Sequence, residues 1–330
     1  MRIALDAMGG DRAPDAPLGG VSLAVGQDPD LEVVVVGPAD LLRGRISHPR
    51  VWFEEAPDVI APDEPPVAAV RRKPRASLVR AAALVKSGEA GGLVSAGNTG
   101  AMMAAGLMLL GRLDGVERPA LTAVLPTRDG RGVLLLDVGA NSEARAPQLL
   151  QFAWMGAHYA QQVLGRNAPR VALLNIGSEA NKGPAAVRTA YHELQNQQAL
   201  NFVGNVEGRD LLDGVADVVV SDGFVGNIVL KAIEGTALGM MGQIRTALSS
   251  GTRARLGGLL ARPALMTVRR NMDYEEVGGV PLLGLNGVVI KAHGASGPRA
   301  FANAIHRAVE QARGRVGTLI AESLTAGEVP

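Results

Sequence analysis

The sequence predicts an α/β fold with a mainly parallel sheet. Short runs rich in Val, Leu and Ile recur along the chain, and each is followed by a polar loop with glycine and then by a helical pattern. Five of these loops stand out, at residues 96–100, 138–142, 177–183, 223–227 and 293–297. In such sheets ligands bind beyond the carboxyl ends of the strands. We therefore expect the loops to gather at one edge and to form the functional site.

The clearest strand–loop–helix unit lies between residues 205 and 235. The Val-rich run 217–222 predicts a strand buried on both faces, and the two glycines and the asparagine of 223–227 are typical of a tight turn or helix cap. A helical pattern begins at Ile228. The amino end of such a helix presents N–H groups and the positive end of its dipole, so this junction predicts an anion site.

The other elements follow in chain order. The sequence predicts strands at 2–6 and 33–36, a helix at 17–26 between them, a Pro-rich loop at 57–66 and a helix at 77–87. The remaining four loops each follow a predicted strand, at 93–95, 133–137, 171–176 and 288–292. Pro147, Pro184 and Pro298 mark the beginnings of the helices after the last three of these loops, since proline suits a first helical turn.

No linker or low-complexity segment divides the chain, so we expect residues 1–330 to form a single two-lobed unit. The segment 239–273 departs from the strand–helix alternation and predicts a helical projection. Within it, arginines alternate with leucines from Arg253 to Leu260. A basic amphipathic element of this kind suits an anionic membrane surface or an acidic partner protein. The alternative is a dimerisation arm, which the periodicity alone favours slightly.

The composition excludes several classes of function. Lysine and arginine number 33 against 32 acidic residues, and aromatic residues make up 3% of the chain, which argues against nucleic-acid binding. Cysteine is absent, which excludes disulfides, thiolate metal sites and a cysteine nucleophile. The amino terminus lacks the apolar core of a signal peptide, and the apolar stretch 101–110 is too short to span a bilayer. These features are compatible with a soluble, cytoplasmic protein.

The loops carry mainly neutral hydrogen-bond donors and single charges. A Walker A motif, the G-x-G-x-x-G of dinucleotide-binding folds and the G-x-S-x-G of α/β-hydrolases are all missing. The donor-bearing loop residues are Asn98, Thr99, Asn141, Ser178, Lys182, Asn205, Asn227, Lys231 and His293. Such donors suit a phosphate or an oxyanion. Each of them alone is more often a turn or cap residue, and it is their concentration in similar loops that indicates a site.

His293 is the one histidine in a Gly-rich strand-end loop, so it is the best histidine for acid–base work. The alternative is a histidine that only hydrogen-bonds a loop carbonyl. Carboxylates also lie near the loops: Asp6, Asp11, Asp137, Glu179, Glu207 and Asp222. They could hold a divalent metal, but no tight ligand set stands out and helix capping is their commoner role. We expect neither a metal nor an organic cofactor.

Eight ordered motifs carry a resemblance to a known family. They are DAMGGD at 6–11, SAGNTGA at 95–101, LDVGAN at 136–141, LLNIGSEANKG at 173–183, FVGNVEGRD at 202–210, DVVVSDGFVGNIVLKAIEG at 217–235, GGVPLLGLNG at 278–287 and HGASG at 293–297. From end to end the chain resembles the bacterial phosphate acyltransferases of phospholipid synthesis, the PlsX family. Ala180 is a small departure, because a second acidic residue is expected after Glu179, and it weakens any catalytic claim for this position.

The resemblance implies a three-layer α/β/α sandwich, Rossmann-like and related to phosphotransacetylase and isopropylmalate dehydrogenase. It implies transfer of a fatty acyl group from acyl carrier protein to inorganic phosphate, which gives acyl phosphate and free carrier protein. It also implies a homodimer that associates peripherally with the inner face of the cell membrane. There a membrane-bound glycerol-3-phosphate acyltransferase would consume the acyl phosphate.

The loop chemistry agrees with that reaction. Phosphate and a departing thiolate need little proton transfer, so the protein has mainly to hold two anions together and to stabilise a tetrahedral oxyanion. We expect Lys182 and the helix terminus at Asn227 to bind phosphate. Asn98 and Asn141 would polarise the thioester carbonyl, and His293 would assist the departing sulfur. Further candidates for binding substrate or phosphate are Asp6, Gly97, Thr99, Gly100, Ser178, Asn205, Glu207, Asp222, Gly226 and Lys231.

The carrier protein of this pathway is acidic, so its docking surface should be basic. One candidate surface is the triplet Arg71, Arg72 and Lys73, which a solvated helix end would explain equally well. The other comprises the arginines between 253 and 270. The membrane association of the family shifts the interpretation of the second group towards a bilayer-facing tip. The residues of that tip are Arg253, Arg255, Leu256, Leu259 and Leu260.

Three alternatives remain. One is a phosphotransacetylase-like enzyme that uses acyl-CoA, which donor length would distinguish. Another is a metal-dependent β-decarboxylating dehydrogenase, which is disfavoured because neither a cofactor fingerprint nor a carboxylate cluster is convincing. The third is a membrane scaffold for lipid-synthesis enzymes, but a scaffold needs no polar strand-end loops.

Overall fold

The computed structural model describes residues 1–271 and 279–325. The described strands form one eleven-stranded sheet in the order β3-β2-β1-β4-β11-β10-β5-β6-β9-β7-β8. Neighbours in this sheet are parallel, except that β10 pairs antiparallel with β11 and β5, and β5 pairs antiparallel with β6. The expectation of a mainly parallel sheet is therefore confirmed.

In sheet order the strands are β3 (Val51–Glu55), β2 (Glu32–Gly37), β1 (Arg2–Asp6), β4 (Gly92–Ser95), β11 (Val288–Lys291), β10 (Val280–Leu283), β5 (Ala120–Leu125), β6 (Val133–Leu136), β9 (Val218–Val220), β7 (Val171–Asn175) and β8 (Phe202–Glu207). The α-helices are α1 (Asp15–Gln27), α2 (Ala39–Leu42), α3 (Pro66–Arg72), α4 (Ser77–Lys86), α5 (Thr99–Ala105), α6 (Ala146–Gln162), α7 (Ala185–Gln195), α8 (Gly223–Ser249), α9 (Thr252–Asn271), α11 (Pro298–Arg313) and α12 (Val316–Thr325). A π-helical turn, Gly106–Leu110, continues α5.

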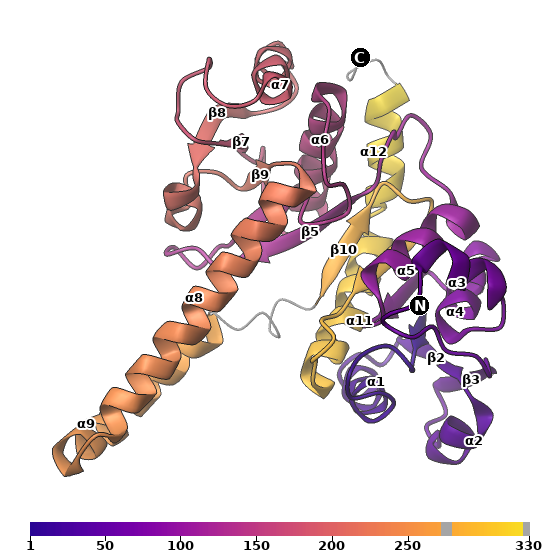
Figure 1. The fold of residues 1–330 in the computed structure, drawn as a ribbon. Coiled ribbons are helices and arrows are strands. Elements are labelled where there is room, and N and C mark those ends of the chain that lie inside the picture. The colour runs from indigo at the N-terminus through magenta and orange to yellow at the C-terminus, as the bar shows by residue number, and fades with distance from the viewer. Residues whose placement is uncertain (272–278, 326–330) are drawn as a thin grey trace.

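The antiparallel pairs divide the sheet into two halves (Figure 1). Strands β1–β4 and β11 run in one direction, and β6–β9 run in the opposite direction beyond β10 and β5. The loops 96–100 and 293–297 follow strands of the first half, and the other three predicted loops follow strands of the second. The expectation of one common edge is therefore wrong. Its cause is the three reversals of strand direction in the middle of the sheet, which no local sequence pattern reveals.

Helices cover both faces of each half and give three layers. In the first half, α1 and α11 pack on one face, and α4 and α5 pack on the other. In the second half, Val218 and Val220 of β9 face α6, while Val219 faces the opposite core, on which the first part of α8 packs. All three valines are buried, so the Val-rich run is a strand covered on both faces, as predicted from its composition.

Helix α8 begins at the carboxyl end of β9 and is 27 residues long. Val229, Leu230 and Ile233 pack against the core next to β5 and β6, and the helix then leaves the body of the protein and forms a projection with α9 (Figure 1). The projection thus continues a helix that starts at Gly223, without a break at residue 239. By length and composition alone α8 could cross a membrane. Residues 272 and 273 of the expected segment lie outside the described residues.

Candidate active site

Two of the polar loops and the first turn of α8, which comprises the predicted turn 223–227, start from one row of residues in the second half of the sheet. Leu136 of β6 aligns with Val220 of β9, and Val220 aligns with Leu173 of β7. Because β6, β9 and β7 are parallel neighbours, the loops that follow them emerge at the same edge. We call this the polar edge; it comprises residues 137–145, 176–184 and 221–227.

The loop after β6 is organised around one buried carboxylate. Asp137 is fully buried, and its Oδ1 accepts hydrogen bonds from the main-chain N–H groups of Leu121, Gly139 and Ala140 at 3.0, 3.1 and 3.0 Å. Its Oδ2 accepts one from the N–H of Asn141 at 2.7 Å. Burial raises the pKa of Asp137, and these donors oppose the rise. Asp137 therefore gives the loop its shape.

The side chain of Asn141 is committed to the same structure. Its Nδ2 donates to the carbonyl oxygen of Pro119 at 2.8 Å and to Oδ2 of Asp137 at 2.9 Å, which uses both of its N–H groups. Its main-chain carbonyl accepts a hydrogen bond from the N–H of Gly223 at 2.7 Å. Asn141 thus joins the loop to the first residue of α8, and this geometry leaves no side-chain N–H to polarise a thioester.

The first turn of α8 is capped by the protein itself. Asp222 is the N-cap residue, and its Oδ1 accepts a hydrogen bond from the N–H of Val225 at 2.8 Å. The N–H of Gly226 donates to the carbonyl of Asp222 at 3.0 Å. Most of the N–H groups that the sequence assigned to an anion are therefore satisfied internally, and Asp222 has the capping role that is common for such residues.

Asn227 lies beside the Asp137–Asn141 loop because Gly226 lets the helix approach it. A Cβ on Gly226 would lie 1.9 Å from the carbonyl oxygen of Asp137, so only glycine fits. One residue further, the side chain of Asn227 reaches Gly139, where an added Cβ would lie 3.7 Å from Asn227 Cγ. Lys231 follows one turn later on the same helix face. An amide and an ammonium group are thus presented on one face of α8.

The loop 176–184 supplies the second cation. Lys182 is exposed, and its Nζ lies 3.9 Å from Oε1 of Glu179, which is also exposed. An exposed pair at this distance is weak, so the ammonium group can turn towards a bound anion. Asn205 of the adjacent strand β8 is buried and donates to the main-chain carbonyl of Glu179 at 2.9 Å. Ser178 is exposed, and Glu207 pairs with Arg209 at 2.9 Å.

A separate polar cluster lies at the carboxyl ends of β1, β4 and β11. Buried Asp6 accepts hydrogen bonds from Ser95 Oγ at 2.7 Å and from the N–H of Met8 at 3.1 Å, and burial raises its pKa. These contacts engage both oxygens of Asp6, so the structure commits this side chain to Ser95 and to the turn after β1. The Nζ of Lys291 donates to the carbonyls of Ala292 at 2.5 Å and Ala96 at 3.4 Å. Burial lowers the pKa of Lys291 to about 8.

The remaining first-half candidates build the start of α5. Asn98 caps this helix: its Oδ1 accepts from the N–H of Ala101 at 3.0 Å, and its Nδ2 donates to the carbonyl of Pro62 at 2.7 Å. The N–H of Gly97 donates to Ser95 Oγ, and an added Cβ on Gly100 would lie 2.6 Å from Pro66. Thr99 is exposed.

His293 lies in the loop after β11. It is exposed, and its Nδ1 accepts a hydrogen bond from the N–H of Ala295 at 3.2 Å.

The structure thus sorts the predicted residues into two groups. Those in the second half are Asn141, Ser178, Lys182, Asn205, Glu207, Asp222, Gly226, Asn227 and Lys231, and those in the first are Asp6, Gly97, Asn98, Thr99, Gly100 and His293. Two residues that sequence reasoning missed are Asn175 and Lys291, whose contacts hold loops in place. Each is the last residue of its strand before a Gly-rich loop, and that position was the only available signal.

In both candidate surfaces most of the predicted residues are exposed, and Lys73 is the exception. Arg71 and Arg72, at the end of α3, are exposed. Lys73 is bound through Nζ to Glu64 at 2.6 Å and to the carbonyl of Val59 at 2.8 Å, so it is not available to a partner in the same way. On α9 the predicted tip residues Arg253, Arg255, Leu256, Leu259 and Leu260 are exposed, and Leu260 is 77% exposed.

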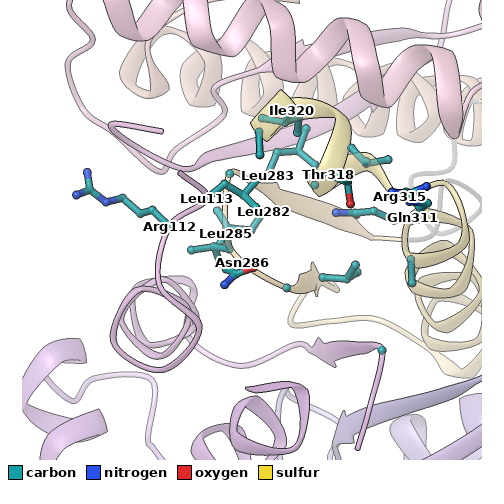
Figure 2. Close-up of a pocket in the computed structure, with 18 of the residues that line it drawn as sticks. Arg112, Leu113, Leu282, Leu283, Leu285, Asn286, Gln311, Arg315, Thr318 and Ile320 are labelled. Carbon is teal, nitrogen blue, oxygen red and sulfur yellow. The ribbon is translucent and has the colours of Figure 1, made fainter. Parts of the chain in front are cut away.

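A cavity of about 580 Å³ lies elsewhere in the fold (Figure 2). Leu282, Leu283 and Leu285 line it from the end of β10 and the residues after it, and Gln311 and Arg315 line it from α11 and the turn that follows. None of the site residues predicted from the sequence belongs to its lining. The cavity therefore does not coincide with the polar edge.

Comparison with known proteins identifies the family. Residues 1–318 match the family described as "Fatty acid synthesis protein". The chain is 47% identical over 325 residues to the phosphate acyltransferase of Bacillus licheniformis, with 98% of each chain covered. It is 46% identical over 308 residues to that of Staphylococcus aureus strain Newman, with 93% of each chain covered. The chain belongs to the phosphate acyltransferase family. It is therefore an acyltransferase, as its motifs indicated.

Solved structures similar to this chain support its fold. A phosphotransacetylase from Streptococcus pyogenes superposes with a TM-score of 0.62 at 16% identity, covering 95% of this chain and 94% of that one. A branched-chain phosphotransacylase from Enterococcus faecalis gives a TM-score of 0.59 at 17% identity, covering 94% and 99%. At these identities the likeness concerns the fold, and it confirms the expected α/β sandwich. Membership of the phosphate acyltransferase family further implies phosphate and an acyl group as substrates.

Proposed function

We propose that this protein transfers a fatty acyl group from acyl carrier protein to inorganic phosphate at the polar edge. The products are acyl phosphate and free carrier protein, and the reaction serves phospholipid synthesis. The observation that carries the proposal is the position of Lys182 and Asn227, which follow the adjacent parallel strands β7 and β9. Asn227 also lies against the loop that Asp137 shapes.

The reaction requires the protein mainly to position the two substrates and to stabilise the negative charge of the transition state. A phosphate oxygen attacks the thioester carbonyl carbon, the C–S bond breaks, and the sulfur leaves as a thiolate that takes a proton from solvent. Phosphate is largely ionised near neutral pH, and a thiol pKa of about 8.5 makes the thiolate an adequate leaving group. Transfer is direct, without an acyl-enzyme. It requires two anions to be held together and the oxyanion to be stabilised.

The contacts of the polar edge refine the roles assigned from the sequence. Lys182 binds phosphate, with Lys231 as a second cation on the face of α8 that carries Asn227. Because both N–H groups of Asn141 are engaged, the amide of Asn227 takes over the polarisation of the thioester carbonyl. Asn98 and His293 follow strands of the first half, whose loops emerge at the opposite edge of the sheet, so the proposal assigns them no step at the polar edge.

The carrier protein, the membrane and a second subunit have separate surfaces in this proposal. Arg71 and Arg72 form the basic surface that receives the acidic carrier protein. The α9 tip, with Arg253, Arg255, Leu256, Leu259 and Leu260, contacts the inner face of the cell membrane. Exposed apolar residues of α8, including Leu238 and Met240, form the homodimer contact. Acyl phosphate then passes to a membrane-bound glycerol-3-phosphate acyltransferase.

An assay of thiol release tests the reaction. The protein is incubated with palmitoyl-carrier protein with and without phosphate, carrier thiol is measured, and acyl phosphate is trapped with hydroxylamine. We expect thiol release to require phosphate and to equal the trapped product. Thiol release without phosphate would indicate hydrolysis and would overturn the proposal.

The same assay distinguishes the second candidate function. The fold likeness to phosphotransacetylases makes acyl-CoA the alternative donor. Faster turnover of acetyl-CoA than of palmitoyl-carrier protein would favour that alternative.

A further inference from the structure

The loop that carries Lys182 contains no helix or strand. Side chains from other parts of the protein bind its main-chain carbonyl groups and fix its conformation. Residues 176–184 connect β7 to α7. Three side chains hold carbonyl groups of this loop. Asn205 Nδ2 binds the carbonyl of Glu179 at 2.9 Å, Asn175 Nδ2 binds that of Lys182 at 3.1 Å, and Arg188 binds that of Gly183 at 2.6 Å.

Asn175 is the anchor that acts on Lys182 itself. It is the last residue of β7, and its strand position is fixed by pairing with Glu207 of β8. Its Oδ1 accepts a hydrogen bond from the N–H of Ile176 at 2.8 Å, while its Nδ2 donates to the carbonyl of Lys182. One amide group therefore joins the beginning of the loop to its end.

Two glycines leave the space that this arrangement needs. Gly183 has a φ of +82°, and a Cβ there would lie 2.4 Å from Oδ1 of Asn175. A Cβ on Gly177 would lie 3.1 Å from Cγ of Lys182. The amide of Asn175 thus packs where a side chain at 183 would stand, and the lysine stem passes over Gly177. These contacts fix the main chain of the loop and the first carbons of the Lys182 side chain.

We propose that Asn175 is a positioning residue that sets the place of the Lys182 ammonium group through the carbonyl of Lys182. This inference rests on the proposed function, since it assigns Lys182 to phosphate. A lysine has a flexible four-carbon stem, so the region its nitrogen can reach depends on where the main chain is held. A displacement of about 1 Å can reduce a rate about a hundredfold.

The inference is tested by steady-state kinetics on Asn175→Ala and Asn175→Asp. The Asp variant keeps the acceptor for the N–H of Ile176 and loses the donor to Lys182, whereas the Ala variant adds no charge near phosphate. We expect both to raise KM for phosphate and to lower kcat/KM for phosphate about 10- to 100-fold. KM for the acyl donor should stay unchanged, because the loop contributes its cation to phosphate alone. Gly183→Ala should give the same pattern by displacing the Asn175 amide.

Asn201→Ala is the matched control. Asn201 Nδ2 also donates to a main-chain carbonyl, that of Ala168 at 3.0 Å, but it precedes β8 at the opposite end of the strands. We expect Asn201→Ala to unfold at the same temperature as Asn175→Ala but to keep the wild-type kinetic constants. If Asn175 had only a structural role, the kinetic constants of both variants would change alike, or Asn175→Ala would change KM for both substrates.

The outcomes separate the inference from the proposed function. If wild type shows no phosphate-dependent thiol release, the proposed function fails. If wild type is active, Lys182→Ala is impaired and both Asn175 variants keep wild-type KM for phosphate, then only the positioning role is overturned. A selective rise in KM for phosphate in both Asn175 variants supports it.

Discussion

A Cβ on Gly226 would lie 1.9 Å from the carbonyl oxygen of Asp137. Helix α8 therefore meets the Asp137–Asn141 loop backbone to backbone, and the contact is closed by the hydrogen bond from Gly223 to the carbonyl of Asn141. This approach brings Asn227 over Gly139. The first turn of the long projecting helix α8 is thus part of the polar edge.

Replacing Gly226 should separate the helix from the loop. We expect Gly226→Ala to destabilise the fold by about 1–3 kcal/mol, because the atom it meets belongs to the backbone and cannot turn away. Activity should fall in parallel as Asn227 moves. Gly235→Ala in the same helix meets open space and should stabilise the protein by about 0.5–1 kcal/mol. Urea unfolding measures both, and equal stabilities would contradict the close contact.

The lowered pKa of Lys291 predicts that the stability of the fold depends on pH. Burial lowers its pKa from 10.5 to about 8 in the folded protein, and nearby Asp11 and Asp6 oppose this shift. Between these two pH values the unfolded chain binds more protons at this site, so the contribution of Lys291 to stability increases as pH rises. The free energy of unfolding of wild type should therefore rise relative to that of Lys291→Met from pH 8 to pH 10.5. A difference that stays constant over this range would rule out the lowered pKa.

Membrane contact through the α9 tip predicts a loss of liposome binding. Changing Leu256, Leu259 and Leu260 to Gln together should abolish flotation with vesicles that contain anionic lipid, because these side chains supply the exposed apolar area. Thiol release from soluble substrate should be unaffected. Undiminished flotation would reject the tip as the membrane contact.

Carrier docking at the end of α3 predicts a charge effect confined to one substrate. We expect Arg71→Glu with Arg72→Glu to raise KM for acyl-carrier protein about tenfold at low salt and to leave KM for phosphate unchanged. Lys73→Gln is the control within the triplet, because its ammonium group is held by Glu64 and Val59. A smaller effect of the double change than of Lys73→Gln would place the docking surface elsewhere.

The strand–loop–helix pattern was sufficient to predict the α/β class, and the Val-rich run at 217–222 was sufficient for a doubly covered strand, because both depend on local periodicity. The family followed from the ordered motifs. The division of the loops between two halves could not be predicted, since it depends on the antiparallel pairing of β10 and β5 in the middle of the sheet.

Individual roles were less accessible to sequence reasoning than the fold. Asn98, Asn141 and Asp222 carry the donors and acceptors that a ligand site needs, but the structure engages those groups in caps and loop contacts. A sequence shows which hydrogen-bonding groups exist, whereas only the folded structure shows which of them already have partners. Asn175 and Lys291 were missed for the converse reason, because their importance depends on carbonyl groups they reach across a loop.

The central claim is that Lys182 and Asn227 act together on phosphate and the thioester at the polar edge. Its most direct test is the rate of phosphate-dependent acyl-phosphate formation by Lys182→Met, Asn227→Ala and the double variant. The account predicts a loss of about 100-fold or more for each single change, and less than the product of these losses for the double change, because the two groups serve one transition state. Single variants within about twofold of the wild-type rate would contradict it.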